Sequence, residues 1–132
     1  MLSVGVKGNR QVTVTKEMLA CSVGSGDVKV YATPMMVAEI EETAASSVAP
    51  LLEEGKVTVG TLVQVKHVAA TPEGMKVRFE TELTDISKNG RFLTFRVSAY
   101  DEKELIGEGI HSRAVVDQER FEKKTAEKLK AE

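Results

Sequence analysis

The stretch TPMMVAEIEETAASSVAP, residues 33–50, is the one long helical pattern with an apolar stripe in this chain. Thr33 is expected to cap the first turn with its hydroxyl, and Pro34 suits the first helical position, where its missing N–H costs nothing. Pro50 is expected to end the helix, because the residue before a proline is driven out of the α region. At about 100° per residue, the apolar positions form a single stripe. Its members are Val37, Ile40, Ala44, Ala45 and Val48.

Glu41 falls near the centre of that stripe. A carboxylate is costly to bury unless it is paired, hydrogen-bonded or protonated. The simple interpretation is a residue at the rim of the helix whose carboxylate reaches water. The alternative is a carboxylate kept there for function.

The composition bounds the class of protein. The chain has 132 residues, enough for one domain (1–132) with a real core, and its formal net charge of -2 argues against a nucleic-acid partner. Cys21 is the only cysteine, which excludes an internal disulfide or a cysteine-rich zinc site and fits a reducing cytoplasm. Two histidines among scattered carboxylates show no metal-ligand spacing, so neither a metal nor a cofactor is expected. No apolar run is long enough to span a membrane, and the first residues lack a signal-peptide core.

Extended stretches surround the helix. A short one at 11–15 precedes a short helical segment at 16–23 that Thr15 is expected to cap, and residues 28–32 are expected to be extended. Four longer ones follow, at 57–69, 75–87, 91–100 and 104–116, and Asn89-Gly90 is a hairpin signal between the second and third. Asp117 is expected to cap a charged helix at 118–132. The predicted fold is α+β, with a curved antiparallel sheet wrapped around one central helix.

The strand at 57–69 carries two of the notable residues. With a period of two, His67 shares a mostly apolar face with Val57, Val59, Thr61, Val63 and Val65. His67 therefore points toward the packed side, as a core histidine or as a functional one. Gly60, which this period places on the opposite face, marks either a bulge or the close approach of a ligand.

Thr33, Glu41 and His67 together form a candidate acid–base set for hydrolysis. Each also has a simpler interpretation, and for Thr33 the helix cap suffices. His111 shares a face with Gly107, Gly109 and Arg113 and is interpreted as a partly exposed strand residue. Cys21 is interpreted as a small buried hydrophobe.

The segment YATPMMVAEIEETA resembles the hotdog-fold thioesterases, most closely the fluoroacetyl-CoA thioesterase type, through its Ala-Thr, Met-Val and Ile-Glu pairs. The similarity continues through APLLEEG, VGTLVQVKHVAATPEGMKV and RFLTFRVSAYDEKELIGEGIHSRAVV. It covers residues 30–123, and the motifs recur in the same order at matching distances. The resemblance implies a hotdog fold and an acyl-CoA thioesterase that hydrolyses a small acyl-CoA to free acid and CoA.

The resemblance also assigns roles. The family's catalytic threonine, glutamate and histidine fall on Thr33, Glu41 and His67. The glycine and arginine implicated in holding the acyl-CoA fall on Gly60 and Arg113. A homodimer, with a tetramer as a further step, and an active site at the subunit interface are implied as well.

One segment departs from the family. The residues before the Ala-Thr pair, CSVGSGDVKVY, are shorter than the aromatic-containing lid of the fluoroacetyl-specific enzyme and contain no phenylalanine. The sequence thus predicts that the hydrolytic residues are kept while the acyl group differs. Two other functions stay open at this level: a non-catalytic module that binds acyl-CoA or an acyl carrier, and an enoyl-CoA hydratase.

Overall fold

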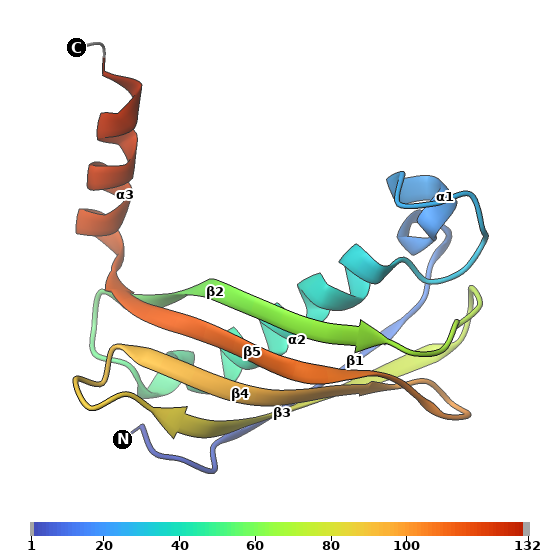
Figure 1. The fold of residues 1–132 in the computed structure, drawn as a ribbon, viewed down its shortest axis with the longest axis horizontal. Helices are drawn as coiled ribbons and strands as arrows, with labels where there is room; N and C mark the ends of the chain where they lie inside the picture. Colours follow the sequence, from blue (N-terminus) through green and yellow to red (C-terminus); the bar gives the residue numbers. More distant parts are fainter. Residues whose placement is uncertain (1, 131–132) are drawn as a thin grey trace.

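In a computed structural model, described for residues 2–130, one helix lies along one face of a five-stranded antiparallel sheet (Figure 1). The strands are β1 (Lys7–Thr13), β2 (Lys56–His67), β3 (Lys76–Ile86), β4 (Phe92–Tyr100) and β5 (Leu105–Asp117). The α-helices are α1 (Ala20–Val23), α2 (Thr33–Val48) and α3 (Gln118–Ala126). Short 3-10 turns are η1 (Lys16–Met18), η2 (Ala49–Leu51) and η3 (Glu127–Leu129). The predicted fold is confirmed.

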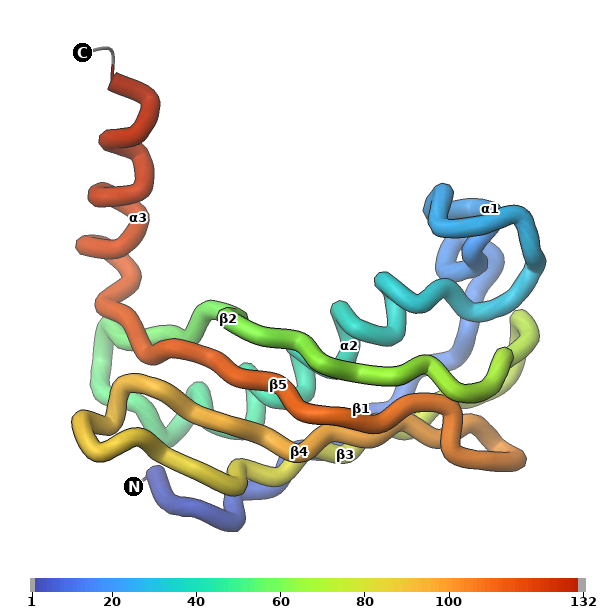
Figure 2. Tube along the Cα trace, in the orientation of Figure 1, coloured from blue at the N-terminus to red at the C-terminus, as the bar shows by residue number. Residues whose placement is uncertain are grey.

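The strand order is β1-β3-β4-β5-β2, so the sheet is not a simple meander. β3, β4 and β5 follow one another as hairpin neighbours, whereas β2 pairs with β5 at one edge. The chain therefore crosses from the β2 edge to β3 through residues 68–75, the yellow-green loop of Figure 2. Both β1 and β2 are edge strands.

The core lies between α2 and the sheet. The inward faces of β3 and β4 follow a period of two, because alternate residues from Val77 to Leu83 and from Leu93 to Ala99 are buried. α2 contributes its own buried residues to this layer, namely Met36, Ile40, Thr43, Ala44 and Val48. The buried stripe is thus centred on Ile40 and Ala44, and the prediction that Glu41 lies near the centre is wrong. Glu41 lies at the edge of the stripe, with 39% of its side chain exposed.

α2 begins one residue differently from the prediction. Ala32 is the N-cap residue and Thr33 is the first helical residue, whose side chain makes no capping hydrogen bond. Thr15 does occupy the N-cap position, of the 3-10 turn η1, but its side chain makes no capping hydrogen bond. At the other end of α2 the chain tightens into the 3-10 turn η2, which contains Pro50, so the proline does end the α-helix.

The face prediction for β2 is wrong in its first half, because the strand contains a bulge. The pairing register with β5 shifts between Gly60 and Leu62. One extra residue reverses which face the following side chains occupy. Gly60 pairs with Arg113, and Val63 pairs with His111. Since directly paired residues share a face, Gly60 lies on the same helix-facing side as Val63 and His67.

Two smaller predictions are corrected and one is confirmed. Cys21 is exposed rather than buried. Residues 28–30 form bends, with only an isolated bridge between Leu19 and Tyr31, so this segment is not a strand. Asp117 does cap α3, because its Oδ1 accepts a hydrogen bond from the Arg120 backbone N–H at 3.0 Å. α3 projects from the end of the sheet opposite α1 (Figure 1); the last two residues of the predicted helix at 118–132 lie outside the described residues.

Candidate active site

Thr33 and His67 meet where the start of α2 passes the end of β2. The Thr33 Oγ1 lies 2.7 Å from the His67 Nδ1, a hydrogen-bond distance. Thr33 does not cap the helix, so its hydroxyl is free for this contact. A hydroxyl held against an imidazole nitrogen is the arrangement of an activated nucleophile and its base.

His67 is set up to remain neutral near pH 7. Burial lowers the pKa of His67, because desolvation disfavours the imidazolium. Its Nε2 is buried and has no hydrogen-bond partner among residues 2–130. The ring of Tyr31 meets the imidazole edge to face, with centroids 6.5 Å apart. A neutral imidazole in this position is able to accept a proton.

Glu41 belongs to a second group of residues further along α2. Its Oε1 lies 3.7 Å from the Arg113 Nη1, close enough for an ion pair but too far for a hydrogen bond. A Cβ built on Gly60 would lie 2.7 Å from the same carboxylate oxygen. The absence of a side chain at residue 60 therefore leaves room for Glu41 over β2. Of the two roles predicted for Gly60, the bulge is observed, because the register with β5 shifts between Gly60 and Leu62. The group that approaches the Gly60 backbone closely is the Glu41 carboxylate.

Arg113 is buried and held from two sides. Its Nε donates to the Thr58 Oγ1 at 2.7 Å, and its Nη2 donates to the Thr58 carbonyl at 3.0 Å. Its Nη1 donates to the His111 Nε2 at 3.1 Å. Burial lowers the pKa of Arg113 while Glu41 opposes the shift, and an arginine keeps its charge regardless. The guanidinium is therefore a fixed positive charge beside Glu41.

The two groups are separate within one chain. Thr33 and Glu41 are eight residues apart on α2, which is about 12 Å at the rise of an α-helix. The structure brings Thr33 to His67, and it brings Glu41 to Gly60 and Arg113, but it does not join these two sets in one protomer.

Sequence reasoning missed two residues of the second group. His111 is fully buried, not partly exposed as predicted. An uninterrupted period of two puts Thr58 on the face opposite His67, and the bulge reverses this. The signal available for His111 was its shared face with Arg113, which the structure confirms.

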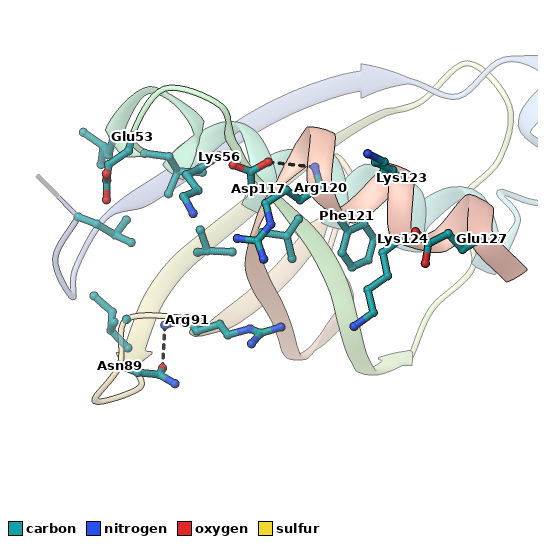
Figure 3. A pocket seen from close by; sticks show the side chains of 17 residues that line it. Glu53, Lys56, Asn89, Arg91, Asp117, Arg120, Phe121, Lys123, Lys124 and Glu127 are labelled. Carbon is teal, nitrogen blue, oxygen red and sulfur yellow. Dashed lines mark hydrogen bonds between the residues drawn. The ribbon is translucent and has the colours of Figure 1, made fainter.

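A cavity of about 1250 Å³ lies elsewhere. It is an open hollow between α3 and the β3–β4 hairpin, with Arg91, Arg120 and Lys124 among its lining side chains (Figure 3). None of the five predicted site residues lines it. Among residues 2–130 there is no group of histidine, cysteine, aspartate and glutamate residues that could hold a metal ion. Nor is any helix of that range long and apolar enough to cross a membrane.

Comparison with known proteins supplies the family. The sequence pattern of the fluoroacetyl-CoA-specific thioesterases matches residues 14–119, which include all five predicted site residues. The chain belongs to this family. It is 42% identical over 103 residues to a fluoroacetyl-CoA thioesterase of Streptantibioticus cattleyicolor, a match covering 78% of this chain and 73% of the relative. As a member of the family it is a thioester hydrolase, the first of the three functions considered.

Solved structures agree with the fold of this thioesterase-family chain. A fluoroacetyl-CoA thioesterase superposes with a TM-score of 0.90 at 33% identity, covering 98% of this chain and 99% of that one. A Thermus thermophilus protein described as a thioesterase superfamily member superposes with a TM-score of 0.88 at 30% identity, covering 100% and 98% of the two chains. The hotdog fold predicted from the sequence is confirmed.

Proposed function

We propose that this chain hydrolyses small acyl-CoA thioesters to the free acid and CoA, with His67 as the base. The observation that carries the proposal is the 2.7 Å contact between the Thr33 hydroxyl and the His67 imidazole in a member of a thioesterase family. Hydrolysis adds the elements of water across the C–S bond, so one proton must leave the attacking oxygen and one must reach the sulfur. A neutral imidazole performs both transfers in turn.

The second group is proposed to receive the substrate. Arg113 and Gly60 hold the acyl-CoA, and Glu41 acts on the thioester carbon or on the water that attacks it. A fixed cation and a carboxylate placed before the reaction begins stabilise charge without reorganisation. The Arg113–Glu41 separation of 3.7 Å leaves both groups available to a bound molecule.

We further propose that the working enzyme is a homodimer whose two copies pair along β2. This edge strand is long, and Leu62 and Val63 at its middle are 47% and 40% exposed. Unpaired edge strands favour pairing with another strand. Antiparallel pairing about this point would lay Gly60 of one copy near the His67 end of the other. Each complete site would then take Thr33 and His67 from one copy and Glu41 from its partner. The lone cysteine agrees with a cytoplasmic location.

The direct test is a thiol-release assay on a panel of acyl-CoAs, run on wild type, His67→Gln and Thr33→Ala. We expect thiol release by wild type and a loss of about 100-fold or more in kcat for His67→Gln, the scale of general-base catalysis. The outer-face variant Ile110→Val serves as the matched control and should behave as wild type. Binding of acyl-CoA without thiol release by wild type would overturn the proposal, as would near-wild-type turnover by His67→Gln.

A further inference from the structure

His111 is a fully buried imidazole that the proposed reaction does not use. It lies on β5 between two structures that face the substrate side. One is the bulge of β2, which sets Gly60 opposite Glu41, and the other is the guanidinium of Arg113. We propose that His111 is a positioning residue that fixes these two structures relative to each other. The inference rests on the proposed function, in which Gly60 and Arg113 hold the acyl-CoA.

The contacts of His111 define its protonation state. Its Nδ1 lies 2.7 Å from the Leu62 carbonyl oxygen, and a carbonyl only accepts, so Nδ1 carries a proton. Its Nε2 lies 3.1 Å from the Arg113 Nη1, which only donates, so Nε2 is unprotonated. His111 is therefore the neutral Nδ1–H tautomer. Each ring nitrogen has one defined partner.

The first contact acts on the bulge. Leu62 is the residue at which regular pairing with β5 resumes after the register shift. A bulge interrupts the ladder and leaves backbone groups in need of partners. The imidazole N–H satisfies the Leu62 carbonyl and thereby pins the strand just after Gly60. The imidazole itself is stacked near the Phe95 ring, with centroids 6.2 Å apart, so it has little freedom to turn.

The second contact completes the support of Arg113. Thr58 takes the Nε and one Nη2 proton, and His111 takes one Nη1 proton. Since a guanidinium has five donors in a rigid plane, these three contacts set its orientation and leave the other Nη1 proton on the side of Glu41. Without the acceptor at His111, the edge of Arg113 that faces Glu41 loses the one hydrogen bond that its Nη1 makes within residues 2–130.

Two conservative variants separate these contacts. In His111→Gln, the terminal amide oxygen takes the place of Nε2 and still accepts from Arg113. In His111→Asn, the shorter amide takes the place of Nδ1 and donates to Leu62, but it does not reach Arg113. The pair therefore removes one contact at a time while each keeps a polar side chain in the same pocket.

The test is steady-state kinetics of thiol release with the two variants and with Ile110→Val, which lies on the exposed face of the same strand. We expect His111→Asn to raise KM about tenfold or more, because the residue that holds substrate has lost its support, with kcat less affected. His111→Gln keeps the contact with Arg113 but no longer holds the Leu62 carbonyl, so it should raise KM by a smaller factor, about threefold to tenfold. In an Arg113→Lys background, His111→Asn should cost less than threefold further, because contacting residues are non-additive. A KM within about twofold of wild type in both variants, or full additivity of His111→Asn with Arg113→Lys, would overturn the proposal.

A second measurement needs no variant of His111. Two-bond proton–nitrogen NMR correlation reports the tautomer of each imidazole, and this chain has only two histidines, so His67→Gln assigns both. We expect His111 as the neutral Nδ1–H form at pH 7. The Nε2–H tautomer or an imidazolium would refute the inference even if His111→Asn fails to fold. Absence of hydrolysis by wild type would instead refute the proposed function, which keeps the two failures distinct.

Discussion

Gly60 faces the carboxylate of Glu41 across a space too small for a side chain. A Cβ there would lie 2.7 Å from the Glu41 Oε1, 3.4 Å from the His111 Cε1 and 3.5 Å from the Arg113 Nη1. The tightest of these neighbours is the far end of a flexible side chain that is partly exposed. A methyl group would therefore move the carboxylate rather than break the fold.

Gly60→Ala should accordingly separate activity from stability. We expect kcat/KM to fall about tenfold or more, because small displacements of reacting groups are costly. The free energy of unfolding should change by less than about 1 kcal/mol, since alanine is at least as favourable as glycine in a strand. Urea unfolding and thiol release on the same samples check this. A large loss of stability, or unchanged activity, would contradict it.

The pH dependence of the reaction should report His67. Burial lowers the pKa of His67 below its ordinary value of about 6.5. A base works in its neutral form, so kcat/KM should be level above the folded-state pKa and fall as the pH drops through it. We therefore expect the midpoint of the acid limb below about pH 6.5, with a slope of one proton. Measuring kcat/KM over a pH series checks this. The control is His111→Gln, which should show the same acid limb as wild type. A midpoint above pH 7 would exclude His67 as the base.

Among the elements, β2 and α2 do the positioning. The bulge of β2 turns Gly60 and Thr58 to the helix-facing side, where period-two alternation would have put them on the other. The register of α2 puts Thr33 beside the end of β2 and Glu41 beside its bulge. Thr58 and Gly60 thus lie on the face opposite to the one that a strand without a bulge would give them. The positions of Thr33 and Glu41 follow directly from the 3.6 residues per turn of an α-helix.

The pairing of β2 with β5 also depends on Gly109, and this gives an element-scale prediction. A Cβ on Gly109 would meet the backbone oxygen of Gln64 and would lie 2.8 Å from the Val65 Cα. These are backbone atoms that cannot turn away, so Gly109→Ala should destabilise the fold by about 3 kcal/mol or more. Urea denaturation checks it, with Gly60→Ala as the matched control on the opposing strand. A stability equal to wild type would show that β2 shifts freely against β5.

For the whole molecule, the separation of Thr33–His67 from Glu41 makes the proposed dimer a part of the proposed reaction. With each protomer carrying both halves about 12 Å apart along α2, antiparallel pairing of β2 would combine halves from different copies. The exposed middle of β2 is the surface this pairing would cover.

Complementation tests that arrangement. Glu41→Gln and His67→Gln are each expected to be nearly inactive alone. Mixed at equal amounts under conditions that exchange subunits, half of the dimers are mixed, and each mixed dimer has one intact composite site. We therefore expect recovery of about a quarter of wild-type activity. Native mass spectrometry monitors the exchange of subunits. If activity does not recover although subunits have exchanged, each complete site lies within one chain.

Local periodicity was enough to predict several parts of the fold. The inward faces of β3 and β4, the Asn89-Gly90 hairpin and the Asp117 cap all follow from the spacing of apolar and turn-forming residues. The resemblance that identified the family likewise rests on short motifs in order. None of these features depends on which residues from distant parts of the chain lie nearby in the fold.

Features that depend on contacts between residues far apart in the chain could not be predicted in this way. One extra residue in β2 reversed the face of Thr58 and Gly60. Gly60 indicated a bulge as one of two alternatives, but the local pattern does not fix whether or at which residue the ladder with β5 slips. Likewise, Thr33 looks like a helix cap until His67, 34 residues away, takes its hydroxyl. His111 resembles a surface residue in the sequence, but in the fold both of its ring nitrogens are hydrogen-bonded, to the Leu62 carbonyl and to Arg113. Periodicity sets which way a side chain points, but its partner is set by register and packing across the whole chain.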